Sequence, residues 1–137
     1  MGSGPIDVDS AKVQHNSYVA KLKSLKVEVL KLMPDDNYPD CCFVEDQVVV
    51  IDDRALITNA GAQSRKGEKD AIVGILSEKL VLEFMESPAE LDGGDVLRVG
   101  NTIYVGSSTR TNIHGIKFLE DFGTFPLKFF LMSLHAY

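Results

Sequence analysis

The first third of the chain shows two different hydrophobic patterns. Apolar residues recur at three- and four-residue spacing between residues 11 and 25, which is typical of a helix with one buried face. Ser10 comes just before this run and is a residue type that caps helices. Residues 27–34, VEVLKLMP, then alternate apolar and polar positions and stop at a proline, as a strand does. The pattern therefore predicts a helix capped by Ser10, followed by a strand.

The rest of the chain contains two copies of one order of predicted elements, namely strand, strand, helix, strand. The first copy has strands on either side of Asp52-Asp53, a short helix carrying Ile72 to Leu80, and a strand at residues 80–85. The second copy has strands at residues 96–99 and 102–106 around Gly100-Asn101, a helix capped by Thr111 that runs to Gly123, and a strand in FPLK. Such units cannot bury their apolar faces alone, so we expect neighbours arranged around an axis or along a solenoid.

In each copy an acidic residue enters the hairpin and an arginine follows it, just ahead of the helix. A hairpin returns the chain to the end where it began, so Asp46 with Arg65, and Asp95 with Arg110, should lie at the same end of the assembly. Two interpretations remain open. The carboxylates can hold a guanidinium or amidine while the arginines hold the carboxylate of the same arginine-like ligand. Alternatively, the acids and arginines pair with one another and cap loop amides.

Composition narrows the classes of partner. The chain has 137 residues, 45% of them hydrophobic, which fits one globular domain. A formal net charge of −6 argues against nucleic acid or an anionic membrane surface as a partner. Two adjacent cysteines cannot form a disulfide framework, and no apolar run approaches the roughly 20 residues that cross a bilayer. We therefore expect a cytoplasmic protein that binds a small molecule.

Four linked motifs, PDCCFVEDQVVV, ALITNAGAQSR, LDGGDVL and STRTN, resemble those of the dimethylarginine dimethylaminohydrolases of the pentein superfamily. The resemblance implies an α/β fold, a five-bladed α/β propeller of which the strand-strand-helix-strand units form part. The expected organisation is a flexible lead at residues 1–6, an incomplete pentein domain at 7–128 and an unmatched tail at 129–137. Members of the family hydrolyse asymmetric dimethylarginine and monomethylarginine to citrulline and dimethylamine or methylamine, relieving inhibition of nitric oxide synthase, without metal or organic cofactor.

The resemblance also implies roles for individual residues. Three acids and two arginines match positions that bind substrate: Asp40, Glu45, Asp46, Arg65 and Arg110. Of these, Glu45 and Asp46 match the acids that hold the guanidinium end of the substrate and the neighbouring loops. Asp92 matches the acid that orients the catalytic histidine, and Gly93 and Gly94 let the backbone approach closely there.

The nucleophilic cysteine and the catalytic histidine of the family lie in its C-terminal half, which this sequence does not contain. We therefore expect a truncated chain without turnover of its own. Cys41 and Cys42 sit beside acidic residues, and not beside the cations or helix N-terminus that activate a nucleophilic cysteine, so we interpret them as packing residues. His15 and His114 are interpreted as surface histidines. His135 falls close to the expected catalytic histidine, but the residues that surround it in the family are absent.

Three other interpretations remain open. The chain can be a non-catalytic product that binds an arginine analogue or a partner, associating with itself through exposed strand edges. It can be a truncated gene model. It can also belong to another group of guanidine-modifying penteins, such as the arginine deiminases or amidinotransferases. No acidic stretch has the spacing of a calcium loop and no His/Cys set has zinc spacing, so no metal is expected.

Overall fold

The computed structural model describes residues 6–123 and 127–131 and divides into two compact units. The first, Met1–Met33, is called the helical unit here, and the second, Pro34–Tyr137, the sheet unit. The sheet unit holds all the strands of the described residues and every residue expected at the functional site.

The helical unit is built on α1, Val8–Ser24, which Asp7 caps rather than Ser10. The Asp7 carboxylate accepts hydrogen bonds from the backbone N–H of Ser10 at 3.0 Å and from its hydroxyl at 2.8 Å. These two bonds lower the pKa of Asp7. The prediction of Ser10 as the cap was therefore wrong, because the helix begins three residues earlier and Ser10 lies in its first turn as a donor to Asp7.

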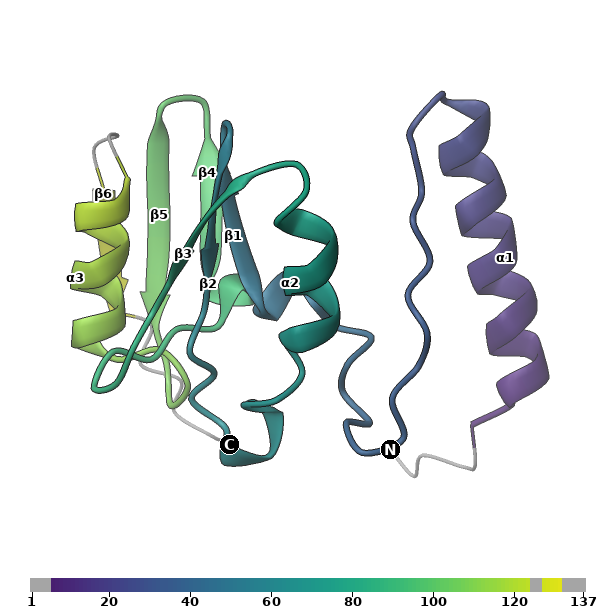
Figure 1. The fold of residues 1–137 in the computed structure, drawn as a ribbon, viewed down its shortest axis with the longest axis horizontal. Helices are drawn as coiled ribbons and strands as arrows, with labels where there is room; N and C mark the ends of the chain where they lie inside the picture. Colours follow the sequence, from purple (N-terminus) through teal and green to yellow (C-terminus); the bar gives the residue numbers. More distant parts are fainter. Residues whose placement is uncertain (1–5, 124–126, 132–137) are drawn as a thin grey trace. The chain divides into compact units, whose positions relative to one another are not determined.

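The predicted buried face of α1 is not present, since no residue of this helix is buried. Val13 and Tyr18 are more than half exposed, and only Val19 and Leu22 reach intermediate burial. The strand predicted at residues 27–34 is also wrong, because this segment pairs with no strand among the described residues. It runs extended beside α1 (Figure 1). One helix and one extended segment bury too little surface to enclose an apolar face.

The two predicted copies of strand-strand-helix-strand are confirmed in the sheet unit. The first consists of β1 (Val48–Ile51), β2 (Arg54–Ile57), α2 (Asp70–Leu76) and β3 (Val81–Phe84); the second consists of β4 (Val96–Val99), β5 (Thr102–Ser107), α3 (Ile113–Phe122) and β6 (Leu127–Leu131). In each copy the first two strands are antiparallel and the third runs parallel to the second. The strand orders are β1-β2-β3 and β4-β5-β6, so one topology occurs twice.

Short 3-10 helices lie in the loops, namely η1 (Val44–Asp46) before β1, η2 (Gln63–Arg65) after β2, and η3 (Gly93–Asp95) before β4. Two of them, η1 and η3, occupy equivalent places in the two copies. The hairpin turns fall at Asp52 and Gly100, which have φ of 55° and 58°. Asp tolerates this left-handed region and Gly adopts it without strain.

One core serves both copies. Buried apolar residues from the two sheets, the loop after β3 and α3 form a single cluster: Ile51, Leu56, Met85, Ala89, Leu91, Ile103, Val105, Ile116, Leu119 and Phe122. Figure 1 shows the two sheets side by side between α2 and α3. Asn112 begins α3 by accepting the Gly115 N–H at 2.8 Å, so the prediction of Thr111 as the cap was wrong. The Thr111 hydroxyl instead donates to Asp95. Each copy thus buries its apolar face against the other, as its repeat pattern requires.

Candidate functional site

The predicted acids and arginines gather where η1 and η3 meet. These two 3-10 helices contact each other, and the Gly94 N–H donates to Asp46 Oδ1 at 3.1 Å. A Cβ built on Gly93 would overlap the carbonyl oxygen of Glu45. Only a residue without a Cβ allows this approach, so Gly93 joins the loops of the two copies.

Arg65 lies at the centre of a buried ionic network. Its residue surface is 4% exposed, and its Nη1 lies 2.6 Å from Asp46 Oδ2. Its Nε and Nη2 donate to the carboxylate of Glu68 at 2.8 to 3.1 Å. Gln47 Nε2 also donates to Glu68, at 2.8 Å. The hydrogen bonds to Glu68 are the main cause that raises the pKa of Arg65, so its charge is permanent.

Arg65 also holds the backbone of the acidic loop. Its Nη2 donates to the carbonyl oxygens of Asp40 at 3.2 Å and Phe43 at 3.4 Å. A guanidinium has five N–H groups, and these contacts leave one on Nη1 without an acceptor among the described residues. Arg65 therefore both pairs with protein acids and keeps one donor for another group. The same-end placement of Asp46 and Arg65 is confirmed.

Glu68 and Gln47 were not expected at the site. Glu68 lies in the charged stretch SRKGEKD, which the sequence pattern marks only as a polar loop. Its three-residue separation from Arg65 is a spacing at which opposite charges pair on a helical turn, and this was the available signal. Gln47 directly precedes β1, a strand of four apolar residues. A polar side chain at the start of such a strand needs a hydrogen-bond partner if it is buried.

Asp92 is a buried carboxylate without a hydrogen bond. Its side chain is 1% exposed, and Arg110 Nε lies 2.8 Å from its Oδ2. The N–H of Arg110 is not aligned with that oxygen, so neither carboxylate oxygen of Asp92 accepts a hydrogen bond within the described part of the chain. Burial raises the pKa of Asp92, the charge of Arg110 opposes this shift, and Asp46 adds to it. A buried carboxylate in this state lacks a donor.

The remaining site residues are arranged around these two centres. Asp95 lies at the same end as Arg110 but accepts hydrogen bonds from Ser108, at 2.7 Å, and from Thr111. Asp40 and Glu45 are exposed, and within residues 6–123 and 127–131 their carboxylates form no hydrogen bond or ion pair. Two exposed acids thus lie beside a buried arginine and a buried acid, which suits a ligand with separate positive and negative ends.

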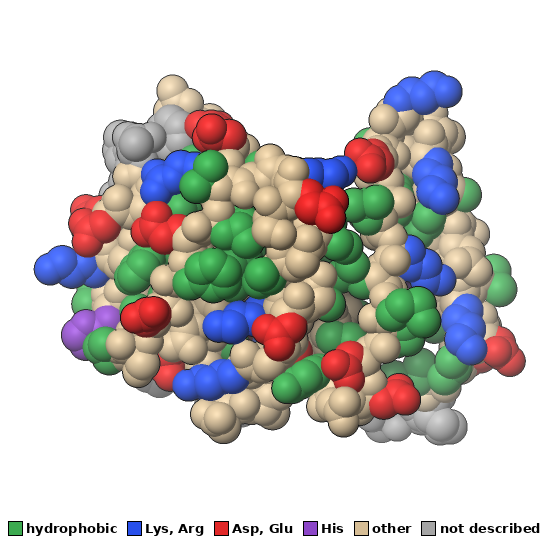
Figure 2. Space-filling view, in the orientation of Figure 1, with side chains coloured by type: hydrophobic (Ala, Val, Ile, Leu, Met, Phe, Trp, Pro, Cys, Tyr) green, Lys and Arg blue, Asp and Glu red, His purple; other side chains and the backbone are tan. Residues whose placement is uncertain are grey.

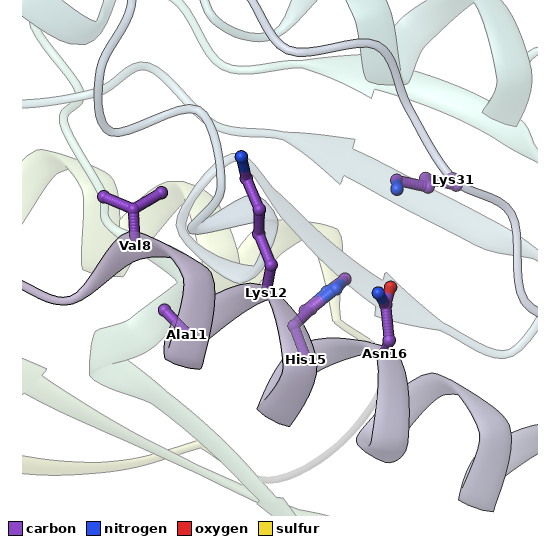
Figure 3. Close-up of a pocket in the computed structure, with 6 residues that line it drawn as sticks. All are labelled: Val8, Ala11, Lys12, His15, Asn16 and Lys31. Atoms are coloured by element: carbon purple, nitrogen blue, oxygen red, sulfur yellow. The ribbon is translucent and has the colours of Figure 1, made fainter.

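Within the described residues, neither cysteine side chain bonds to a carboxylate or guanidinium of this site; Cys41 Sγ lies 3.9 Å from the carbonyl oxygen of Asp35. Cys41 is half-buried, Cys42 is exposed, and both are free thiols. His114 is exposed in the first turn of α3. Within the helical unit, His15 lines an open groove with Lys12 and Lys31 (Figure 3). His135 falls outside the described residues.

The described residues contain neither a metal-binding cluster nor a membrane-spanning helix. In this part of the chain no group of three or more His, Cys, Asp and Glu side chains is placed to hold a metal ion. No helix there is long and apolar enough to cross a membrane.

Replacing Asp92 by asparagine is expected to stabilise the chain. The raised pKa means that folding disfavours the ionised form of Asp92. The resulting loss in the free energy of unfolding is fully present above the folded-state pKa. It disappears as the pH falls below the unfolded-state value of about 3.9. Asp92→Asn should therefore raise the free energy of unfolding by about 1 kcal/mol at neutral pH. Urea unfolding at neutral pH and near the unfolded-state pKa should show the gain shrinking with acidity.

Asp95→Asn is the matched control, because Asp95 already accepts two hydroxyl hydrogen bonds. Its substitution should lower the free energy of unfolding by about 1 kcal/mol. A stability loss of similar size in both variants at neutral pH would contradict the assignment of Asp92 as an unsatisfied group.

Known proteins resemble the chain over nearly its whole length. The family model described as "N,N dimethylarginine dimethylhydrolase, eukaryotic" matches residues 5–134. Two curated N(G),N(G)-dimethylarginine dimethylaminohydrolases align with 116 residues: that of Pseudomonas aeruginosa is 37% identical over 83% of this chain, and that of Streptomyces coelicolor is 41% identical over 84%. The alignments cover 46% and 45% of those proteins. The chain therefore spans less than half the length of these relatives.

Solved structures show the same relationship. A dimethylarginine dimethylaminohydrolase of Pseudomonas aeruginosa, a mutant complexed with citrulline, matches 98% of this chain with a TM-score of 0.87 and 31% identity, covering 55% of that chain. The N-terminal domain of a cyanobacterial arginine dihydrolase shares the fold, with a TM-score of 0.73 at 15% identity. The mixed α/β pentein architecture expected from the sequence is confirmed for the part present here.

Proposed function

Because the chain belongs to the eukaryotic family of N,N-dimethylarginine dimethylhydrolases, we propose that it carries the substrate-binding half of an enzyme that hydrolyses asymmetric dimethylarginine and monomethylarginine. The products would be citrulline and dimethylamine or methylamine. The proposal extends to this chain a reaction that its relatives are named for. By the same proposal the protein acts in the cytoplasm and relieves inhibition of nitric oxide synthase.

The observation that carries this proposal is the state of Asp92. Asp92 is a buried carboxylate with a raised pKa that accepts no hydrogen bond from the described residues, although Arg110 Nε lies 2.8 Å from its Oδ2, so it calls for an aligned N–H donor. An imidazole N–H meets this need, and the hydrogen bond would fix the ring and stabilise its protonated form. Asp92 is therefore proposed to orient a catalytic histidine, which would come from the C-terminal half typical of the family.

The substrate is proposed to lie between the exposed acids and the arginines. The carboxylates of Asp40 and Glu45 would accept N–H groups of the ligand, and Asp46 would hold the adjoining loops through Gly94. The last Nη1 hydrogen of Arg65 and the half-exposed guanidinium of Arg110 would bind the carboxylate of the ligand. A zwitterion with N–H donors at one end and a carboxylate at the other can form N–H···O contacts with both sets of residues.

The chain alone is expected to bind asymmetric dimethylarginine but not to convert it. Hydrolysis in this family needs attack by a thiolate on the guanidinium carbon, whereas Cys41 Sγ lies against the carbonyl oxygen of Asp35 and Cys42 is an exposed free thiol. Citrulline formed by the purified 137-residue chain should not exceed that in a sample without protein. Citrulline release that rises with protein concentration, and that Asp92→Asn abolishes, would refute the expected inactivity.

The choice between methylated and unmethylated arginine separates this proposal from the arginine deiminase interpretation. A pocket for dimethylarginine buries two extra methyl groups, and each buried apolar group favours the methylated ligand by about 1 kcal/mol. The chain should therefore bind asymmetric dimethylarginine more tightly than arginine in a calorimetric titration. Preference for arginine would favour the deiminase interpretation.

Exposed apolar side chains support a second, non-catalytic role. Val81 and Leu97, on β3 and β4, are 63% and 61% exposed. Figure 2 shows apolar side chains lying among charged ones on the face in view. We propose that these strands also associate with a partner or a second copy, which light scattering would show as a mass that grows with concentration.

A further inference from the structure

We propose that Glu68 is a positioning residue of the substrate site. It fixes the guanidinium of Arg65, and Arg65 in turn fixes the loop that carries Asp40 and Glu45. This inference rests on the proposed function, since it assigns Glu68 to the same site. It adds a residue that none of the four sequence motifs contains.

Glu68 holds Arg65 in one orientation. Its side chain is 1% exposed, Oε1 accepts Arg65 Nε at 3.1 Å, and Oε2 accepts Arg65 Nη2 at 2.8 Å. Gln47, the residue just before β1, donates from Nε2 to Oε2 at 2.8 Å. A carboxylate bound by a guanidinium fork and an amide cannot rotate without breaking charged hydrogen bonds. The plane of the Arg65 guanidinium is therefore set by Glu68.

Arg65 transmits this orientation to the acidic loop. Its Nη2 binds the carbonyl oxygens of Asp40 and Phe43, which are the two ends of one turn closed by the Phe43 N–H bonding to Asp40 O at 3.0 Å. A Cβ built on Gly67 would overlap the Tyr38 hydroxyl, so this loop also packs directly on the residue preceding Glu68. A shift of Arg65 would thus move the backbone that presents the Asp40 and Glu45 carboxylates.

The same network reaches the second copy. Arg65 Nη1 pairs with Asp46 Oδ2, and Asp46 Oδ1 accepts the N–H of Gly94, two residues after Asp92. Asp46 also accepts the Thr58 hydroxyl at its backbone oxygen, at 2.8 Å. The buried carboxylate of Glu68 is therefore connected through Arg65 to the loop that carries Asp40 and Glu45. Through Arg65 and Asp46 it is also connected to the loop of Asp92.

The test compares Glu68→Gln, Glu68→Asp and the exposed control Glu78→Gln in the full chain. Glu68→Gln keeps the shape but removes the charge, and should weaken binding of asymmetric dimethylarginine by about ten-fold or more. It should also shift the NMR signal of the Arg65 Nε–H and the amide signals of residues 40–43. Glu68→Asp keeps the charge and should recover part of the affinity. Glu78→Gln should match the wild type, since Glu78 is exposed.

Each outcome decides one claim. Unchanged affinity and unchanged Arg65 Nε–H and residue 40–43 signals in folded Glu68→Gln would overturn the positioning role. If Glu68→Gln does not fold, Gln47→Met, which removes only the amide that holds Glu68, should shift the same signals and weaken binding; no change would overturn the inference. If the wild-type chain binds no dimethylarginine, the proposed function fails, while the NMR signals of Arg65 and residues 40–43 still test Glu68.

Discussion

Arg65→Leu is expected to lower the free energy of unfolding of the chain by about 3 to 5 kcal/mol. The substitution leaves Glu68, whose side chain is 1% exposed, and most of Asp46 as buried negative charges without a counter-charge. It also leaves the carbonyl oxygens of Asp40 and Phe43 without their donor. A loss of this size approaches the whole stability of a typical domain, about 5 to 15 kcal/mol. Urea unfolding followed by circular dichroism measures it.

Arg98→Leu is the matched control for this prediction. Arg98 pairs with Asp52 at 3.1 Å, but both side chains are at least one third exposed. Exposed pairs contribute about 0 to 1 kcal/mol, so this variant should unfold close to the wild type. Similar losses in both variants would show that the buried network of Arg65 does not stabilise the sheet unit more than a surface pair does.

Gly93→Ala is expected to lower the free energy of unfolding by about 1 to 3 kcal/mol and to separate η1 from η3. The added Cβ would overlap the backbone carbonyl oxygen of Glu45 and lie 3.1 Å from that of Val48. Backbone atoms cannot rotate away as a flexible side chain can, so the two loops must move apart. The hydrogen bond from Gly94 to Asp46 should break with them. Faster hydrogen exchange of the Gly94 amide would report this separation.

Gly74→Ala, the same substitution in α2, should have the opposite sign. Nothing lies within 4 Å of a Cβ at Gly74, and this residue is exposed within a helix. Alanine there should raise the free energy of unfolding by about 0.5 to 1 kcal/mol, because it restricts the unfolded chain. Equal effects at both glycines would mean that the contact between the copies does not depend on the missing Cβ.

Hydrophobic periodicity predicted the sheet unit well because its elements bury one face each. The two copies, their hairpins and their helices follow directly from alternating and three-to-four spacing. The pattern failed in the helical unit, where the strand at residues 27–34 has no partner among the described residues. Both predicted helix caps were wrong by one to three residues, since the side chains of Asp7 and Asn112 accept the N–H groups of Ser10 and Gly115 in the first turns.

The site was predictable in its location but not in its pairing. A hairpin returns the chain to one end, which placed Asp46 with Arg65 correctly. The three-residue spacing of Arg65 and Glu68 was compatible with an ion pair but did not single it out, and no pattern indicated that Arg110 would pair with Asp92. The second contact depends on how the loops before β4 and after β5 fold onto each other, which no local pattern encodes.

The most direct test of the account is a calorimetric titration of asymmetric dimethylarginine into the purified 137-residue chain and into its Glu45→Gln variant. The account predicts saturable binding by the wild type that weakens by about ten-fold in the variant, because a ligand-facing carboxylate is lost. Binding of equal strength in both, or no binding by a folded wild-type chain, would contradict the claim that these residues form the substrate-binding half.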